Sequence, residues 1–257
     1  MSESRTRIAL AEFIGTFALI FVGVLAVSAG PFVNAPTSFV NLSSIAFAHG
    51  LIIAVMVAAL AAVSGAHFNP AITMGFVATG RMPIGLGAVY WLAQLAGAIV
   101  AAFILLWILG ADMVALGTPA PGLGVGTGTA ILLEGVGTFF LVFVVFGTAV
   151  DERAPRAVFP LAIGLAITVA IMAIGPMTGG AVNPARAFGP AVASGQWLGQ
   201  AIYWIGPLIG GALGGLVQHH FLMERAPTQI VGERGGPAPA EERGEAPPPE
   251  WPKGRAA

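Results

Sequence analysis

Charge is nearly absent from long stretches of this chain, and no other feature of the sequence constrains its fold as strongly. From residue 8 to residue 80 the only charged side chain is Glu12, and from residue 157 to residue 223 it is Arg186. Only 9% of the 257 residues are charged, whereas a soluble domain contains about a quarter. So few ionic groups cannot cover a water-soluble surface, and we expect these stretches to lie in a lipid bilayer.

Six apolar stretches are each long enough to cross the hydrocarbon core of a bilayer, which takes about 20 helical residues. We predict that the spans occupy residues 8–29, 41–61, 87–109, 129–150, 158–175 and 201–221. The segment that follows them, residues 223–257, is rich in proline and charge and has too few large apolar residues to build a core. We expect it to be a disordered cytoplasmic tail.

Positively charged residues predict how the spans are oriented. The connections at residues 30–40 and 110–128 contain no Lys or Arg, whereas the other span ends carry Arg5, Arg7, Arg81, Arg153, Arg156 and Arg225. Because Lys and Arg favour the cytoplasmic side, an even number of spans with this bias places both termini in the cytoplasm. We therefore expect a multi-pass protein of the cell (inner) membrane.

The two halves of the chain repeat each other. A Glu-x-x-Gly-Thr-Phe sequence begins at Glu12 and again 122 residues later at Glu134. Asn-Pro-Ala occurs at residues 69–71 and 183–185, and Tyr-Trp at residues 90–91 and 203–204. Each half then holds three spans, and an odd number means that the second half crosses the bilayer upside down relative to the first.

Each Asn-Pro-Ala sequence falls where a full span does not fit. About ten residues remain between each box and the next polar turn, and ten helical residues reach roughly 15 Å, half of the hydrocarbon thickness. Asparagine is a good helix N-cap, and proline suits the first helical turn because its missing N–H has no partner there. Asn69 and Asn183 therefore predict half-length helices at about residues 70–79 and 184–193.

Inversion of the repeat brings the two half-helices in from opposite sides, so that their N-termini meet near the midplane. We expect the Gly-rich runs at residues 64–66 and 178–180 to be extended. Irregular backbone at this depth is tolerated only where it lines a polar cavity or is packed in protein, so these runs predict a polar path. The carbonyls expected along this path are those of Ala66, His67, Phe68, Gly179, Ala181 and Val182. Two positive helix ends and the amides of Asn69 and Asn183 should then repel cations, including hydronium, and pass neutral solutes.

These motifs resemble those of the aquaporin (major intrinsic protein) family over roughly residues 8–222. The resemblance rests on Ala-Glu-Phe-Ile-Gly-Thr-Phe at residues 11–17, on both Asn-Pro-Ala boxes, including Pro70, Ala71, Pro184 and Ala185, and on Asn-Pro-Ala-Arg-Ala-Phe-Gly-Pro at residues 183–190. It implies an all-α membrane protein with six transmembrane helices and two re-entrant half-helices in an inverted repeat, assembled as a homotetramer with one pore per subunit. The expected parts are a cytoplasmic N-terminus at 1–7, a first repeat at 8–111, an extracellular connecting loop at 112–128 and a second repeat at 129–222.

Arg186 is a functional candidate, because an unpaired arginine inside a membrane is costly. The resemblance implies that it is the filter arginine, and it assigns the other three filter positions to His49, Ile171 and Gly180. The second span begins outside and the fifth ends outside, which places His49 and Ile171 toward the outer end, level with Arg186. Strict water channels typically have Phe and His at these two positions, so we expect a wider, less polar opening that resembles plant vacuolar members passing ammonia as well as water.

Other positions favour water over glycerol. Glycerol facilitators typically carry Asp after the filter arginine, a basic residue four positions further on, and Pro-Leu in the sixth span. This chain has Ala187, Ala191 and Tyr203-Trp204. We therefore predict a passive channel for water that excludes protons and ions, with ammonia and other small neutral solutes as further candidates. A glycerol or small-solute facilitator of the same family is the first alternative.

Two other functional classes are less well supported by the sequence. An ion-coupled secondary transporter needs ligands for the coupling ion at the midplane. Within the spans only Glu12 and Glu134 are acidic, and we expect them to accept backbone N–H groups of the re-entrant loops rather than to relay protons. His67 is expected to brace the first loop, with a titrating gate as the alternative.

An enzyme would need a nucleophile with a paired base or a metal cluster, and the sequence contains no such constellation. The chain has no cysteine and no basic stripe for nucleic acid. The expected partners are water, small neutral solutes, lipid and further subunits, with no cofactor, metal or nucleic acid.

Overall fold

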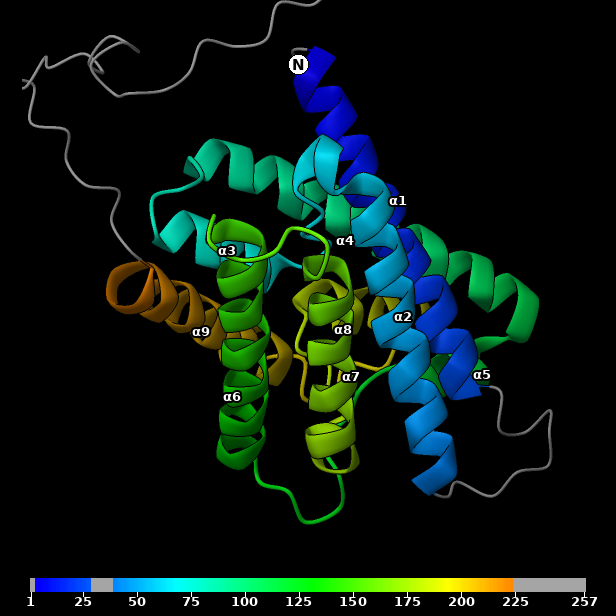
Figure 1. The fold of residues 1–257 in the computed structure, drawn as a ribbon. Helices are drawn as coiled ribbons and strands as arrows, with labels where there is room; N and C mark the ends of the chain where they lie inside the picture. Colours follow the sequence, from blue (N-terminus) through cyan, green and yellow to red (C-terminus); the bar gives the residue numbers. More distant parts are fainter. Residues whose placement is uncertain (1–2, 29–38, 224–257) are drawn as a thin grey trace, which may run out of the picture. The chain divides into compact units, whose positions relative to one another are not determined.

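The computed structural model describes residues 3–28 and 39–223, and within these residues every regular element is a helix (Figure 1). Among these described residues, five helices are long and apolar enough to cross a membrane. They are α1 (Glu3–Ser28), α2 (Phe39–Ser64), α4 (Ile84–Leu109), α6 (Thr127–Val145) with its π-helical extension η2 (Phe146–Val150), and α7 (Phe159–Thr178). The sixth predicted span is α9 (Ile202–Val217), which continues without a break into the π-helical turn η3 (Gln218–Leu222). The structure thus confirms the first five predicted spans, and it places a helix at the position of the sixth.

Several helix ends differ from the prediction by a few residues. α1 begins at Glu3, so residues 3–7 of the expected N-terminus are helical. Hydropathy identifies only the part of a helix that lies in hydrocarbon, whereas Glu and Arg are good helix formers and extend α1 beyond that limit. α7 passes Gly175 and includes Pro176 before it ends at Thr178. The predicted tail lies, from residue 224 onward, outside the described residues.

The predicted loop at residues 112–128 contains a short helix, so that prediction is wrong for its first part. α5 spans Ala111–Gly117 and has Asp112 in its first turn. Ala, Met and Leu in this segment are good helix formers, and an acidic side chain is favourable near a helix N-terminus. The Gly and Pro content that predicts a loop is concentrated in residues 117–128.

The two halves pack as matching groups of helices. α1 contacts α2 and α4, α6 contacts α7 and α9, and α2 packs on α7 between the halves. Figure 1 shows α2, α7 and α6 side by side at the front, with α8 behind them. Glycines permit the closest crossings, since a Cβ at Gly97 would lie 2.3 Å from Phe13 O and one at Gly210 would lie 2.0 Å from Gly135 O.

The half-helices α3 (Pro70–Ala78) and α8 (Pro184–Ser194) lie against these long helices and confirm the two predicted short segments. α3 packs on α4 and α9, whereas α8 packs on α4, and the two half-helices also touch each other. Nine residues in α3 and eleven in α8 give each helix about half the length of a span.

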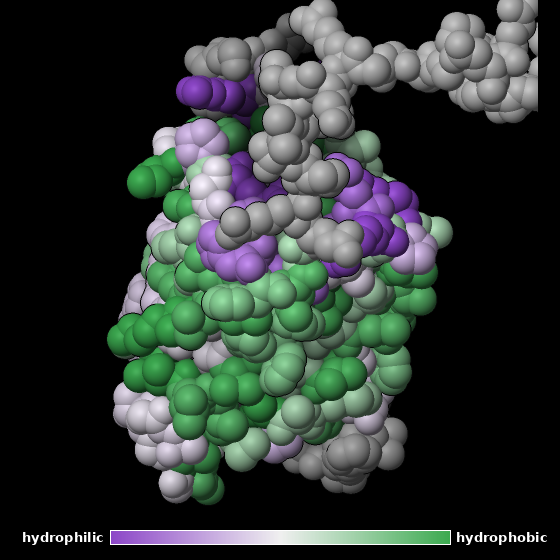
Figure 2. Space-filling view, turned by 60° about the vertical axis from the view of Figure 1, so that its left-hand side comes forward, coloured by the Kyte–Doolittle hydropathy of each residue, from purple (hydrophilic) through white to green (hydrophobic). Residues whose placement is uncertain are grey.

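The outer surface is apolar in the way that a bilayer requires. Large apolar side chains point outward, including Trp107 at 87% exposed, Leu92 at 70% and Leu132 at 66%. Figure 2 shows a broad apolar belt on one face, with hydrophilic residues gathered above it. A soluble protein rarely exposes so much contiguous apolar surface. The chain is a multi-pass membrane protein.

Candidate functional site

Each half-helix begins with an asparagine cap followed by a proline. Asn69 is extended, with φ −155° and ψ 120°, and its Oδ1 accepts a hydrogen bond from Ala71 N at 2.8 Å. Asn183 has φ −157° and ψ 112°, and its Oδ1 accepts from Ala185 N at 3.0 Å and from Arg186 N at 3.3 Å. These bonds satisfy N–H groups of the first turn that no helical carbonyl can reach. The predicted N-caps are confirmed.

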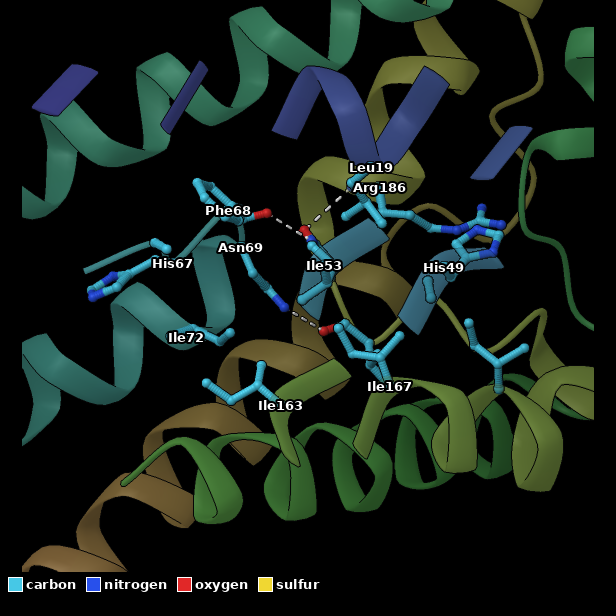
Figure 3. A pocket seen from close by; sticks show the side chains of 15 residues that line it. Leu19, His49, Ile53, His67, Phe68, Asn69, Ile72, Ile163, Ile167 and Arg186 are labelled. Atoms are coloured by element: carbon cyan, nitrogen blue, oxygen red, sulfur yellow. Dashed lines mark hydrogen bonds between the residues drawn. The ribbon is translucent and has the colours of Figure 1, made fainter. Parts of the chain in front are cut away.

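The same two asparagines join the repeats. Asn69 Nδ2 donates to Val182 O at 2.8 Å, and Asn183 Nδ2 donates to Phe68 O at 2.9 Å, as the dashed lines in Figure 3 show. The N-terminus of each half-helix therefore lies within hydrogen-bond distance of the backbone that immediately precedes the other half-helix. A side-chain amide has two N–H groups, so each asparagine keeps one for a molecule in the adjoining cavity.

The extended backbone predicted at residues 64–66 and 178–180 is not found. We call the residues just before the two asparagines, 65–68 and 179–182, the leading segments. Residues 64 and 178 still belong to helices, and left-handed backbone follows at Ala66 (φ 54°), Phe68 (φ 50°) and Val182 (φ 42°). A left-handed residue other than glycine costs about 1–2 kcal/mol, so other bonds must hold this backbone. The sequence contains no signal for it, because these side chains ordinarily avoid positive φ.

Glu12 holds the first leading segment. Its carboxylate is fully buried and accepts from His67 N at 3.0 Å and from Phe68 N at 2.7 Å. Ser64 Oγ and Gln94 Nε2 donate to it as well, at 2.6 and 2.8 Å. Four hydrogen bonds to one buried carboxylate offset the strain of the left-handed residues, since bonds to charged groups are the stronger ones.

Glu134 holds the second leading segment in the same way. It is fully buried and accepts from Ala181 N at 2.9 Å, from Val182 N at 2.7 Å and from Thr178 Oγ1 at 2.7 Å. The hydrogen bonds expected for both glutamates are therefore present. Neither carboxylate lines the narrow cavity between the half-helices, which a proton relay through the pore would have to reach.

A narrow cavity of about 20 Å³ passes between the half-helix tips. Its polar lining comes from His49, His67, Asn69, Asn183 and Arg186. Its apolar wall consists of residues that include Leu19, Ile53, Ile72, Ile163, Ile167 and Ile171. Figure 3 shows Asn69 between His67 at one end and the His49–Arg186 pair at the other. A water molecule needs about 10–15 Å³ of such volume, so the cavity has room for about one water molecule at a time.

A wider cavity of about 310 Å³ adjoins the narrow one, and we name it the outer vestibule because residues 116–120, in the connection predicted to be extracellular, line it. His49, Ile171 and Arg186 line both cavities and therefore lie where the two meet. His49 Nδ1 lies 2.8 Å from Ile45 O and must carry the proton of that bond, which leaves Nε2 as an acceptor. Arg186 Nη1 donates to Gly117 O at 2.9 Å.

Gly180, the fourth predicted filter residue, lies beside Ile171 but does not line either of these two cavities. A Cβ at this position would lie 3.1 Å from Ile171 Cα, and the backbone is left-handed, with φ 58°. A side chain is disfavoured there on both grounds. The structure thus brings three predicted filter side chains together and places the glycine directly behind one of them. Gly179 lines the outer vestibule instead of the narrow cavity.

Three contacts at the site were not predicted from the sequence. Tyr203 donates its hydroxyl to Thr178 O at 2.7 Å, and Tyr90 donates to Ser64 O at the matching place in the first repeat. The repeated Tyr-Trp pair was the signal that could have identified them. Gly117 O, the partner of Arg186, has no such signal, because every residue carries a carbonyl.

His67 takes the bracing position expected for it. Its Nδ1 lies 3.0 Å from Thr73 Oγ1, which itself donates to Asn69 O at 3.2 Å. The hydroxyl has one proton and therefore accepts from His67 Nδ1. The imidazole ring also packs on Phe76 and Tyr90, with centroid separations of 4.4 and 4.8 Å.

Comparisons with known proteins agree with this geometry. A family model described as Major intrinsic protein matches residues 1–218. Aquaporin TIP4-4 of Zea mays is 43% identical over 222 residues, which covers 84% of this chain and 87% of that protein. Aquaporin TIP2-1 of Arabidopsis thaliana is 40% identical over 226 residues, covering 86% and 90%.

Among solved structures, the aquaglyceroporin from Plasmodium falciparum superposes with a TM-score of 0.74. That likeness covers 84% of this chain and 96% of the other, at 22% sequence identity, and it shows a shared fold. The family model and the plant relatives extend the likeness to the sequence. With both Asn-Pro-Ala boxes capping half-helices that meet at their tips, the chain belongs to the major intrinsic protein family.

Proposed function

We propose that this protein is a passive channel that carries water through the narrow cavity between α3 and α8. The observation that carries the proposal is the pair of hydrogen bonds from Asn69 to Val182 O and from Asn183 to Phe68 O. They keep two helix N-termini, each with a partial positive charge, at the centre of the path. The curated relatives named above are themselves aquaporins.

Charge selectivity follows from the lining of this cavity. Among the described residues that line it, none is acidic, and the two buried glutamates are held by backbone N–H groups beside it. At the centre of the path a cation would lose its hydration shell and face two positive helix ends and the N–H donors of Asn69 and Asn183, whereas water loses little. The remaining N–H of each asparagine orients the water oxygen at the centre, which interrupts a chain of proton transfer.

We assign the outer filter to His49, Ile171, Gly180 and Arg186. Arg186 supplies positive charge, His49 supplies an acceptor at Nε2, and Ile171 supplies an apolar surface with the glycine behind it. The backbone carbonyls of Ala66, His67, Gly179 and Ala181 are proposed as further acceptors along the path.

Ammonia is a second candidate solute, and the apolar side of the filter is the observation that favours it. Ile171 stands where strict water channels typically have His. That polar side chain would hydrogen-bond to water and exclude a less strongly hydrated neutral molecule. Glycerol is less well supported, because Ala187 and Ala191 stand where facilitators carry an acidic and a basic residue. The aquaglyceroporin superposition concerns the fold.

The orientation and assembly of the channel are also proposals. Arg81 Nε lies 3.4 Å from His219 Nδ1, and Arg153 Nη2 donates to Leu222 O at 3.0 Å, so these arginines lie at the same end of α9–η3. We take that end as cytoplasmic, which places both termini in the cytoplasm of a cell-membrane protein. The family resemblance supports a homotetramer with one pore per subunit.

The proposal is tested by stopped-flow light scattering of proteoliposomes that contain the purified protein. Osmotic shrinkage should be faster than in protein-free vesicles, should not saturate and should not depend on Na⁺ or pH gradients. A pH-sensitive dye inside the same vesicles should report no added proton leak. Shrinkage at the rate of empty vesicles, or solute uptake that saturates and requires an ion gradient, would contradict the proposal and favour a carrier.

A further inference from the structure

The side chain of Arg186 is anchored at one point. The residue is 6% exposed, and Nη1 donates to Gly117 O at 2.9 Å. Within residues 3–28 and 39–223, this is the hydrogen bond that holds the guanidinium, and the buried Nε has no partner there. The position of the filter charge therefore depends on where the Gly117 carbonyl lies.

That carbonyl lies at the end of α5, where helical carbonyls have no partner within the helix. α5 is fastened to α1, because Ser28 Oγ donates to Met113 O at 2.8 Å. At the end of α5 the backbone of Gly117 packs directly on Val24 of α1. A Cβ at Gly117 would lie 2.7 Å from Val24 Cγ1 and 3.0 Å from Val24 Cγ2, so no side chain fits.

The next residue ties the same point to α8. Thr118 Oγ1 lies 3.2 Å from Ser194 Oγ, in the last residue of the half-helix that carries Arg186. Thr118 Oγ1 donates to Val114 O at 3.1 Å within α5, and Ser194 Oγ donates to Pro190 O at 2.7 Å within α8, so the two hydroxyls are in contact while each proton serves its own helix. Residues 117 and 118 thus connect α1 to α8, and they do so on the side of the outer vestibule.

We infer that Gly117 is a positioning residue for the selectivity filter: because it lacks a side chain, its carbonyl comes close enough to hold Arg186 at the pore wall. This inference rests on the proposed channel function. Any side chain at 117 must push α5 away from Val24 and withdraw the carbonyl. An unpartnered buried guanidinium is costly, so Arg186 would turn outward into the 310 Å³ vestibule, where water can solvate it. The junction between the narrow cavity and the vestibule would then become wider and would lose its positive charge.

The test compares Gly117→Ala with wild type in proteoliposomes, measuring water, urea and proton permeability. Water permeability should be retained. The ratio of urea to water permeability should rise roughly tenfold, because a hydrogen bond to a charged group is strong enough to shift a two-position equilibrium by that factor. A rise in proton leak should accompany it. An unchanged ratio with normal water flux would overturn the inference and leave the channel function intact.

Two matched variants separate positioning from general damage. Gly126→Ala is the control in the same loop, since its φ of −71° suits alanine and its Cβ would meet no atom within 4 Å. It should leave selectivity unchanged. Val24→Ala combined with Gly117→Ala removes Cγ1 and Cγ2, the two closest obstacles, and should restore selectivity.

The outcomes are distinguishable. A wild-type protein without water flux would contradict the channel function itself. If Gly126→Ala loses selectivity as Gly117→Ala does, or if Gly117→Ala loses all water flux and the added Val24→Ala change does not recover it, the inference about Gly117 is wrong.

Discussion

Asn69 donates its side-chain amide to the residue just before Asn183, and Asn183 donates its amide to the residue just before Asn69. The acceptors are Val182 O at 2.8 Å and Phe68 O at 2.9 Å. Each asparagine also caps its own half-helix through Oδ1. One side-chain type therefore starts each half-helix, joins the two repeats and leaves one N–H for the pore.

Replacement of Asn69 by Asp tests the amide separately from the cap. Aspartate keeps Oδ1 for Ala71 N, but it cannot donate to Val182 O and places a negative charge at the pore centre. We expect a loss of about 1–3 kcal/mol of folding free energy from the unsatisfied buried carbonyl. We also expect Na⁺ entry that the wild type lacks. Thermal unfolding in detergent and a sodium-sensitive dye in vesicles measure the two effects, and a variant equal to wild type in both would refute the role of the amide.

Replacement of Glu134 by Gln distinguishes a structural acid from a proton relay. Glutamine must direct an N–H₂ group at Ala181 N or Val182 N, both of which are donors. We expect a lower thermal unfolding temperature and about 1–3 kcal/mol less stability, with no proton flux before or after the change. Glu152→Gln on the exposed surface is the matched control and should have no effect. Proton flux in wild type that disappears in Glu134→Gln would favour the relay.

Replacement of Ile171 by His should narrow the opening between the vestibule and the narrow cavity and add a polar group there. The flux of ammonia and of solutes larger than water should fall relative to the flux of water. Ile171→Val keeps the site apolar and should retain the wild-type ratio. Parallel water, ammonia and glycerol measurements on the same vesicles check this, and identical selectivity in wild type and Ile171→His would show that the filter is assigned to the wrong residues.

Tyr90→Phe and Tyr203→Phe form a symmetric pair. Each change removes a hydroxyl that donates to a carbonyl at the end of the helix before a leading segment, Ser64 O or Thr178 O. We expect similar losses of stability, about 1–3 kcal/mol each, since both leave a buried carbonyl unsatisfied. Because the two tyrosines lie in different repeats, the double variant should lose about the sum. Thermal unfolding of the four proteins measures this, and a neutral Tyr203→Phe would contradict the argument.

Much of the fold follows from local rules that a sequence displays directly. Span length follows from hydropathy, the inversion follows from an odd number of spans per repeat, and the half-helices follow from Asn and Pro at their first positions. The predicted bonds to Glu12 and Glu134 follow from the cost of leaving an acid unpaired in a membrane. The short helix α5 was missed because the glycines and prolines after residue 117 dominate the composition of its loop.

The sequence by itself determined the six crossings, the two capped half-helices and the residue types that the pore requires, because each depends on side chains at short and regular spacing. Tertiary structure alone decided which backbone atoms those side chains meet. Asn69 finds its partner 113 residues away, and Arg186 finds Gly117 O at a separation of 69. A carbonyl is present at every position, so no pattern of side chains can single one out. Only the packing of α1, α5 and α8 brings that carbonyl to the filter.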